Sequence, residues 1–253
     1  MGKLKKFSPI ALGFILLIVV WQIATIVGGH QAALFPPPLK VAEALISIIM
    51  DGSIFNHIQI SLFRFLSGYV TAVIVAVVLG LILGRMPKVW QVIDPIVQVL
   101  RPVSPIAWSP FIVLWFGIGN MSAIVIIFLA AFFPVLLSTV SAVRKVDKTY
   151  LRIAANFEMS QIETLRKIVL PASFPIIANG LHMALGSAWI FLVAGEMVGA
   201  QSGLGFLIID ARNALSLDLV MASIVVIGVI GLILDKGIHY FEAWVNKIWG
   251  GTA

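Results

Sequence analysis

Long apolar runs separated by short polar stretches make up most of this chain. Several of these runs reach the roughly 20 residues that a helix needs to cross a bilayer. We therefore predict an all-α membrane protein with six transmembrane helices, over Pro9–Val27, Ile60–Gly84, Pro95–Phe116, Met121–Val143, Ile176–Ala200 and Leu219–Gly237. The first run follows three lysines and resembles a signal peptide, but it lacks an A-x-A cleavage site, so we interpret it as a retained helix.

The most polar interruption is the loop Arg144–Pro175, which separates the fourth and fifth spans. Asp147 can cap a helix over Lys148–Phe157. Ser160 and a glutamate three residues later form a capping box for a second helix, Gln161–Val169, which the Leu-Pro pair after it is expected to end. The sequence thus predicts two short helices joined at an angle.

Both short helices carry an apolar face near the tip of this loop. Its members are Leu151, Ala154, Ala155, Phe157 and Met159 on the first helix, and Ile162, Leu165 and Val169 on the second. Such a tip is suited to insertion into the groove of a partner protein. The alternative is an interfacial helix pair with no partner.

The first outer loop, Gly28–Gln59, contains a second amphipathic segment. The prolines Pro36–Pro38 keep its beginning extended. Apolar residues then recur at helical spacing from Val41 to Ile49, which predicts a short helix lying at the membrane interface.

Small residues form stripes on two of the predicted spans. On the second span they are Gly68, Ala72, Ala76, Gly80 and Gly84; on the fifth they are Gly180, Ala184, Ala188, Gly195 and Gly199. Small residues at this spacing let helix backbones approach closely in lipid. We expect core packing within one subunit, with a subunit interface as the alternative.

The third span is interrupted by four prolines, which are Pro95, Pro102, Pro105 and Pro110. Broken backbone at membrane depth is tolerated where protein buries it or where it lines a wet cavity. Arg101 lies beside this break and can offer its charge to an anion, or it can mark the inner lipid interface.

Glu196 is a carboxylate within the fifth span and is a functional candidate for that reason. It can line the pathway, pair with Arg212, or hydrogen-bond to a neighbouring helix. His182 and His239 have no metal-like spacing, so we interpret them as interfacial or packed histidines and expect no metal site.

Composition agrees with a membrane protein. Hydrophobic residues make up 60% of the 253-residue chain and charged residues 11%, whereas about a quarter of the residues of a soluble domain are charged. The absence of cysteine excludes disulfides and thiolate metal sites. The net charge of +6 is typical of the basic residues that flank the cytoplasmic ends of membrane helices. It does not indicate nucleic-acid binding, because the basic residues do not gather on one soluble face.

The distribution of the basic residues predicts the orientation. With both termini in the cytoplasm, thirteen of the seventeen fall on the cytoplasmic side: Lys3, Lys5, Lys6, Arg85, Lys88, Arg144, Lys145, Lys148, Arg152, Arg166, Lys167, Lys236 and Lys247. The exceptions are Lys40, Arg64, Arg101 and Arg212. By the positive-inside rule, the loop Arg144–Pro175 is therefore expected to be cytoplasmic.

The end of this loop resembles the EAA signature of permease subunits of binding-protein-dependent ABC importers. Ala154, Ala155, Ile168, Leu170 and Pro171 carry the resemblance. When the pattern is aligned on its Ile-x-Leu-Pro end, Arg152 occupies the Glu position, Ile153 and Ala154 the two Ala positions, and Glu158 the Gly position. The chain departs from the pattern at Arg152, Ile153 and Glu158.

Three further segments extend the resemblance over nearly the whole chain: SPIAWSPFIVLWFGIG, VDKTYLRIAANF and VAGEMVGAQSGLGFLIIDAR. They are similar to the nitrate, sulfonate and taurine branch of type I importer permeases. The resemblance implies the six-helix type I permease fold with cytoplasmic coupling helices, in a bacterial inner membrane. It also implies two partner ATPases that use ATP, a second permease subunit (most simply a second copy), and an extracytoplasmic binding protein.

Carried onto this chain, the resemblance gives two sets of site residues. The ATPase-coupling set is Arg152, Ala154, Ala155, Phe157, Glu158, Met159 and Ser160. The pathway set is Arg101, Ser104, Trp108 and Glu196. The expected parts of the chain are residues 1–57 (first helix and outer segment), 58–240 (permease core with the loop 144–175) and 241–253 (cytoplasmic tail).

Motifs that the sequence lacks limit the functions to be considered. No G-x-x-x-x-G-K-[ST] loop is present, so this chain is expected to bind no ATP itself, and no H-E-x-x-H or G-x-S-x-G motif indicates an enzyme. The expected function is a non-catalytic permease for a small anion such as nitrate, bicarbonate or a sulfonate. The alternatives are a permease for a vitamin-precursor heterocycle and a secondary transporter, which would show charge pairs in its spans and internal repeats.

Overall fold

The computed structural model describes residues 2–27 and 34–248, so part of the predicted outer loop and the last five residues lie outside it. Every regular element in the described residues is helical. In chain order they are α1 (Gly2–Val27), α2 (Pro38–Met50), α3 (Ser53–Arg85), α4 (Pro87–Leu100), the 3-10 turn η1 (Pro105–Trp108), α5 (Ser109–Phe116), α6 (Asn120–Arg144), α7 (Lys148–Asn156), α8 (Gln161–Thr164), the π turn η2 (Leu165–Val169), α9 (Leu170–Gly199), α10 (Leu204–Asn213) and α11 (Leu217–Ile248).

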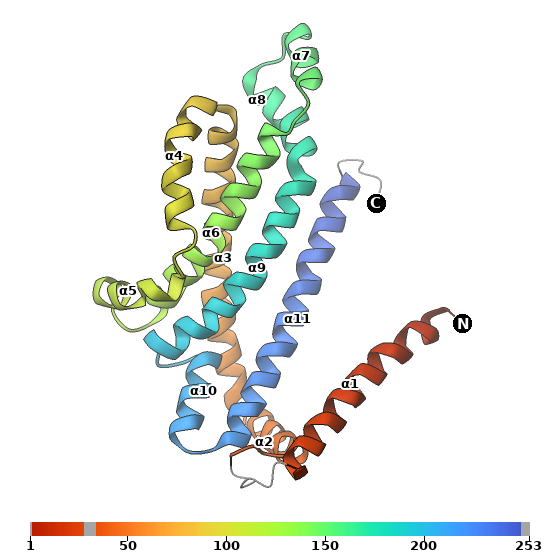
Figure 1. Ribbon diagram of the computed structural model, residues 1–253, viewed down its shortest axis with the longest axis vertical. Helices are drawn as coiled ribbons and strands as arrows, with labels where there is room; N and C mark the ends of the chain where they lie inside the picture. The colour runs from red at the N-terminus through yellow and green to blue at the C-terminus, as the bar shows by residue number, and fades with distance from the viewer. Residues whose placement is uncertain (1, 28–33, 249–253) are drawn as a thin grey trace.

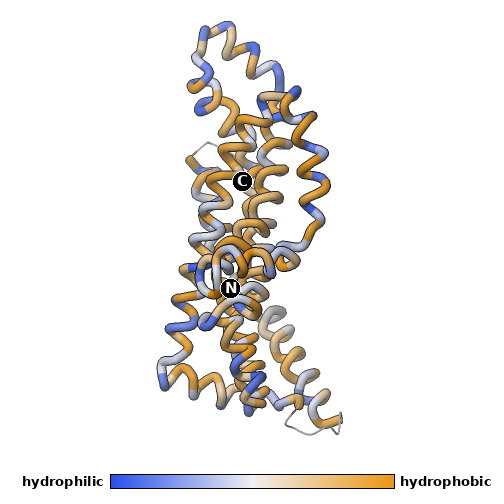
Figure 2. The backbone as a smooth tube through the Cα atoms, turned by 90° about the vertical axis from the view of Figure 1, so that its left-hand side faces the viewer, coloured by the Kyte–Doolittle hydropathy of each residue, from blue (hydrophilic) through white to orange (hydrophobic). Residues whose placement is uncertain are grey.

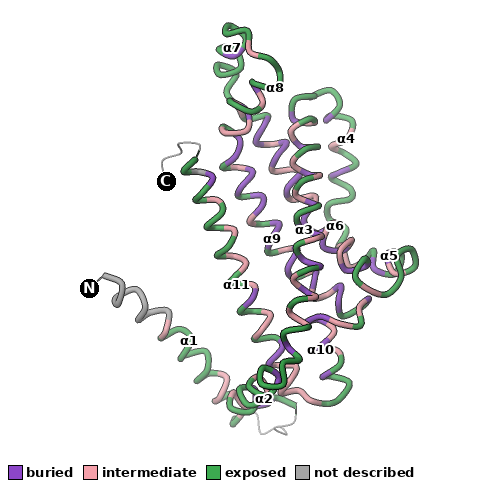
Figure 3. Tube along the Cα trace, turned by 180° about the vertical axis from the view of Figure 1, so that it is seen from behind, coloured by how far each residue is buried: buried purple, intermediate pink, exposed green. Residues whose placement is uncertain are grey.

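Three long helices, α3, α6 and α9, form the centre of the bundle. Their facing sides hold most of the buried residues (Figure 3). Helix α11 packs on α9, α10 and α2, whereas α1 meets α2 and extends away from the bundle (Figure 1). The helices between the ends of the molecule are mainly hydrophobic, and hydrophilic residues gather toward its two ends, one of which holds α7 and α8 (Figure 2).

The small-residue stripes lie inside this bundle, as predicted for core packing. Gly68, Gly80 and Gly84 face α6, where a Cβ on Gly80 would lie 2.5 Å from the Cβ of Thr139. On α9, a Cβ on Gly180 would lie 2.4 Å from the Cβ of Ser138, which is also on α6. These contacts let α6 pack closely between α3 and α9.

Four helices in the described residues are long and apolar enough to cross a membrane: α3, α6, the continuous helix Gln161–Gly199, and α11. The predicted third span is a bent pair instead, in which α4 and the η1–α5 segment meet at 84°. α1 contributes a shorter apolar stretch, Ala11–Val27. Each predicted span therefore corresponds to helix, but the third is not a single straight helix.

Three of the four prolines of the bent pair take positions that proline tolerates. Pro105 and Pro110 each lie in the first turn of a helix, where no hydrogen bond from the missing N–H is needed. Pro102 lies in the break after α4, and Pro95 is accommodated inside α4. The break in the chain therefore occurs between Arg101 and Ser104.

Two boundaries differ from the sequence predictions. The pair Leu170–Pro171 does not end the second loop helix, because the π turn η2 carries it into α9. A π turn moves the hydrogen-bond register by one residue, and Pro171 then lies in the first turn of α9, where its missing N–H is tolerated. In addition, α11 continues past the predicted end of the sixth span, Gly237, to Ile248.

Replacing Gly80 with alanine should reduce the free energy of unfolding by roughly 1–3 kcal/mol, as expected for overpacking. The added methyl group would meet Thr139 of α6. The matched variant Gly228→Ala has nothing within 4 Å, so it should be neutral or stabilising by up to about 1 kcal/mol. Thermal unfolding of the purified chain in detergent measures both effects, and similar melting temperatures for the two variants would contradict this packing.

Candidate functional site

A buried ion pair joins α3 to the end of α9. Arg64 Nη1 lies 2.8 Å from Glu196 Oε1, and the two side chains are 1% and 0% exposed. Removing two charges from water is costly unless their remaining hydrogen-bonding groups are satisfied. The surrounding residues supply those partners.

The Glu196 carboxylate accepts hydrogen bonds at both oxygens. Ser61 Oγ lies 2.8 Å from each of them, and the backbone N–H of Gly205 donates to Oε2 at 2.9 Å. Arg64 also donates from Nε to Asn120 Oδ1 at 2.8 Å and from its terminal nitrogens to the carbonyl and hydroxyl of Ser202. This network connects α3, α6, α9, α10 and the loop that precedes α10.

Glycine is required where this loop passes the carboxylate. Gly203 has φ +103°, and a Cβ there would lie 2.3 Å from Glu196 Oε1. A Cβ on Gly205 would lie 2.4 Å from the carbonyl oxygen of Val193. The Gly-Leu-Gly sequence at the start of α10 therefore allows the backbone to approach Glu196 closely.

The structure resolves the alternatives for Glu196. Its partner is Arg64 and not Arg212, which is exposed on α10. Arg64 was grouped by sequence with the outer basic residues, yet it lies inside the bundle. The sequence does contain a sign that Arg64 has a buried partner. Arg64 lies four residues into a predicted membrane span, where an unpaired arginine is costly.

A separate cavity of about 410 Å³ lies beside the break in the third span. Arg101, Trp108, Ser138, Met183 and Ser187 are among its lining residues. They come from the α4–η1 segment, α6 and α9. The lining combines apolar and aromatic surface with one cationic group and two hydroxyls.

The predicted pathway residues divide between the two places. Arg101 and Trp108 line the cavity, whereas Ser104 is exposed near the break and does not line it. Glu196 is fully buried in the ion-pair network and also does not line it. Figure 1 shows the junction of α4 and α5 about midway along the molecule.

The loop between α6 and α9 has the predicted helix caps. The Asp147 side chain accepts from the Thr149 N–H at 2.8 Å, and this hydrogen bond holds the pKa of Asp147 below its ordinary value. Ser160 and Glu163 form the full capping box of α8. The two helices are therefore fixed locally by their own sequence.

The predicted coupling residues of this loop differ in exposure. Ala154 is only 3% exposed and packs within the subunit. Ala155 is exposed, as are Arg152, Glu158 and Ser160, and Met159 is partly buried. Phe157 and Ile162 are 76% and 77% exposed, so the tip of the loop presents apolar side chains.

Glu158 has a left-handed backbone conformation, with φ +54°. Its N–H donates to the carbonyl of Ala155, and the next N–H, of Met159, donates to the carbonyl of Ala154. This pair of hydrogen bonds is typical of a helix C-cap in which the residue after the helix is left-handed. Glycine usually occupies that position. The chain thus keeps the turn at the signature's glycine position although it has no glycine there.

A further group of side chains was missed by sequence. His182 on α9 lies beside His239 and Glu242 on α11, with possible ligand atoms all within 4.8 Å of one another. The two histidines are far apart in sequence, so spacing along the chain gave no signal. Only the i, i+3 relation of His239 and Glu242 was visible.

Comparison with known proteins identifies the relatives of this chain. Residues 72–247 match the family described as "binding-protein-dependent transport system inner membrane component". The taurine transport system permease protein TauC of Escherichia coli is 37% identical over 94% of this chain and 87% of its own length. The nitrate import permease protein NrtB of Leptolyngbya laminosa is 34% identical over 96% and 90%. The putative aliphatic sulfonates transport permease protein SsuC of Bacillus subtilis is 33% identical over 92% and 86%.

The fold is also similar to a solved structure. A chain of the inward-facing methionine ABC transporter MetNI superposes with a TM-score of 0.54 over 75% of this chain and 96% of that chain. The two are 18% identical in sequence. This similarity supports the type I permease fold.

The ion pair leads to a test by double-mutant cycle. Glu196→Gln leaves Arg64 buried without its counter-charge and should destabilise the chain by about 3–5 kcal/mol. Arg64→Met should cost a similar amount. The double variant should cost clearly less than the sum of the two, because no unpaired charge remains. Melting temperatures in detergent measure the effect.

Arg212→Met, which removes an exposed arginine on α10, is the matched control and should change the melting temperature little. Additive effects of Arg64→Met and Glu196→Gln would show that the two side chains do not interact.

Proposed function

Because the chain belongs to the family of inner-membrane components of binding-protein-dependent transport systems, we propose that it is the permease subunit of an ATP-driven importer for a small anion. The observation that carries the proposal is the position of Arg101 on the wall of the cavity between α4, α6 and α9. A guanidinium group in an apolar cavity attracts an anionic group and can hydrogen-bond to its oxygens.

The relatives agree with an oxygen-rich anion. Their names refer to taurine, aliphatic sulfonates and nitrate. Each of these solutes carries a planar or tetrahedral group of negatively charged oxygens, which suits a guanidinium partner. The buried Arg64–Glu196 pair is a charge pair within the spans, as a secondary transporter would have, but the family of the chain is one of binding-protein-dependent transport and does not favour that alternative. The relatives above are named for anions and not for heterocycles.

The cavity would form a pathway together with a second permease subunit. Arg101 is exposed in the single chain, at the break in the bent pair of helices, and an arginine that faces lipid within a span is costly. A second copy covering the α4–α5 face would enclose the cavity and remove this cost. We therefore propose a pair of permease subunits, most simply a homodimer, with the substrate passing between them.

The loop helices α7 and α8 are the proposed contact with two partner ATPases. Helices α7 and α8 together form an elbow, which is rigid because both helices are capped. Phe157 and Ile162 are exposed apolar residues of this elbow. Exposed apolar anchors of this kind fill pockets in a partner protein. ATP would then be bound and hydrolysed by those partners, and an extracytoplasmic binding protein would deliver the solute.

The loop would transmit motion through α9. The chain runs without interruption from α8 through η2 into α9, so displacement of the elbow shifts the helix that carries Met183 and Ser187 of the cavity. A rigid-body shift of this kind alternates access between the two sides of the membrane. The basic residues near this end support a cytoplasmic position for it and for both termini, in a bacterial inner membrane.

Coupling is tested best at Ala155 and Phe157, because Ala154 is buried in the subunit and its replacement would disturb folding. Ala155→Glu and Phe157→Asp should reduce solute uptake at least tenfold and weaken co-purification of the ATPase, because a charge would enter an apolar contact. The measurements are uptake by cells that express the complete importer, and recovery of the ATPase with the tagged permease.

Met50→Asp is the matched control. Met50 is an exposed apolar residue at the end of α2, 82% exposed, far from the elbow (Figure 1). It should leave ATPase binding unchanged. Normal uptake and normal ATPase recovery in both loop variants would rule out docking at this elbow.

The anion hypothesis is tested at Arg101. Arg101→Gln should raise the KM for nitrate or taurine uptake roughly 10- to 100-fold, which corresponds to loss of a charged hydrogen bond. Arg101→Lys should retain part of the activity, because it keeps the charge but not the bidentate geometry. Arg212→Gln is the control. Uptake at the wild-type rate and KM by Arg101→Gln would contradict this role.

A further inference from the structure

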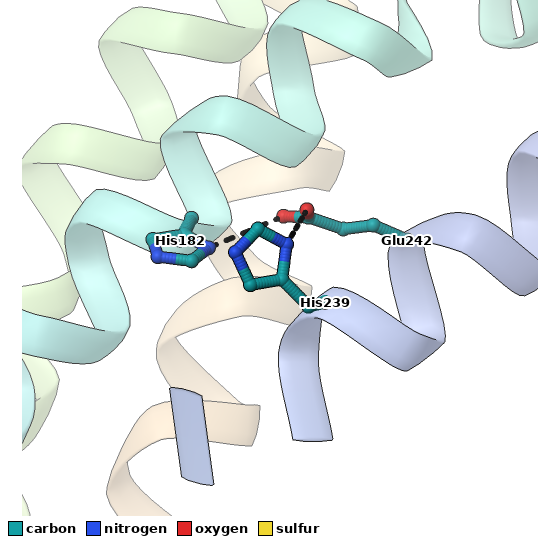
Figure 4. A group of neighbouring side chains, drawn as sticks. All are labelled: His182, His239 and Glu242. Atoms are coloured by element: carbon teal, nitrogen blue, oxygen red, sulfur yellow. Dashed lines mark ion pairs between the residues drawn. The ribbon is translucent and has the colours of Figure 1, made fainter. Parts of the chain in front are cut away.

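Two helices bring together a group of metal-ligating side chains outside the proposed pathway and outside the elbow. His182 projects from α9, and His239 and Glu242 project from α11 one turn apart (Figure 4). The two imidazole rings have centroids 4.7 Å apart and meet at 61°. The edge of each ring faces the same carboxylate.

The distances approach those of a metal site. His182 Nδ1 lies 3.8 Å from Glu242 Oε1, and His239 Nδ1 lies 3.7 Å from Glu242 Oε2. A tetrahedral ion bound at ordinary zinc–ligand lengths holds neighbouring ligand atoms roughly 3.3 Å apart. A small rotation of these side chains would close the remaining gap.

A second carboxylate orients one of the rings. His182 Nε2 lies 2.9 Å from Asp235 Oδ1. In the tautomer that carries its N–H at Nε2, the ring donates to Asp235, and the lone pair of Nδ1 then points toward Glu242. Metal-ligating histidines are usually held in this way by a carboxylate at the other ring nitrogen.

The Glu242 carboxylate, which this nitrogen faces, has an oxygen without a hydrogen-bond partner. Glu242 Oε1 is buried, and no described residue donates a hydrogen bond to it. Two acceptors, Nδ1 of His182 and Oε1 of Glu242, therefore face each other. A buried acceptor without a donor is costly, and a bound cation between the two would satisfy both.

We infer that His182, His239 and Glu242 bind a divalent transition-metal cation of the Zn²⁺ class, with Asp235 as the positioning residue for His182. Two imidazoles and one carboxylate suit Zn²⁺ rather than Mg²⁺ or Ca²⁺, which prefer all-oxygen ligands. His239 is 66% exposed, so the fourth position is open to water or to an external ligand.

The bound ion would join α9 to α11. Helix α9 continues into the elbow, and the C-terminal end of α11 points toward the same end of the molecule as α7 and α8 (Figure 1). The site therefore lies where a cation would restrain the helix that leads to the elbow. Asp235 and Lys236 mark this part of α11 as polar, which gives a hydrated ion access.

The test uses the full chain, purified in detergent after removal of any histidine tag and stripped of metal with a chelator. ZnCl₂ is then titrated and bound zinc is measured per chain by mass spectrometry after gel filtration. We expect about one zinc ion per chain and a rise in melting temperature with zinc, because a ligand that binds only the folded state stabilises it. CoCl₂ should give the visible absorption bands of four-coordinate cobalt.

His239→Gln and Glu242→Gln should each weaken zinc binding at least tenfold, and Asp235→Ala should weaken it by about 10- to 100-fold through the ring that it positions. Tyr240→Gln is the matched control, because Tyr240 is adjacent on α11 and 76% exposed; it should bind zinc as the unchanged chain does. Each variant is compared without metal first, so that a folding defect appears as a lower melting temperature before zinc is added.

Three outcomes would overturn the site. The first is loss of zinc from the unchanged chain during gel filtration. The second is equal zinc binding by all variants, which would indicate adventitious binding elsewhere. The third is a melting temperature of the unchanged chain that does not change when zinc is added.

Discussion

The buried ion pair between Arg64 and Glu196 constrains the end of the bundle where α9 meets α10. Neither charge can be removed from water without nearly full hydrogen bonding, so every neighbouring group must hold its place. Ser61 and Asn120 position α3 and α6 against the pair, and Gly205 brings the start of α10 onto the carboxylate. Four helices thereby meet in one arrangement, and the end of α9 is fixed where α10 turns back toward α11.

Helix α9 connects the main features of the chain. It begins as the continuation of the capped elbow, contributes Met183 and Ser187 to the cavity, and carries Glu196 in its last turn. Its small residues allow α6 to pack closely along it, so the two helices are well suited to move as one body. Helix α9 is held by the hydrogen-bond network around Glu196 at one end and leads to the exposed elbow at the other. A displacement of the elbow can therefore be transmitted along the helix axis. This geometry fits the proposed division between a rigid outer end and a coupling loop.

The elbow keeps its shape although the chain departs from the family signature. Glu158 takes the left-handed conformation that glycine fills in the pattern, at a cost of roughly 1–2 kcal/mol. The hydrogen bonds from its own N–H and from that of Met159 offset this cost. Arg152, at the position of the signature's glutamate, is exposed on α7 and reverses the charge offered to a partner. The turn is therefore retained, while the surface that an ATPase would recognise is changed.

The sequence by itself determined the helices, the elbow and the small-residue stripes. These features depend on local periodicity, capping and residue size, which involve residues close together in the chain. Asp147 and Ser160, for example, cap the helices that directly follow them. The tertiary structure alone decided which distant charges meet. Arg64 with Glu196, and His182 with His239 and Glu242, are joined by packing between helices, and hydropathy cannot say which residues of two spans face each other. The same holds for the π turn at Leu165–Val169, because the packing of α9 decides whether the Leu-Pro pair ends a helix or continues it.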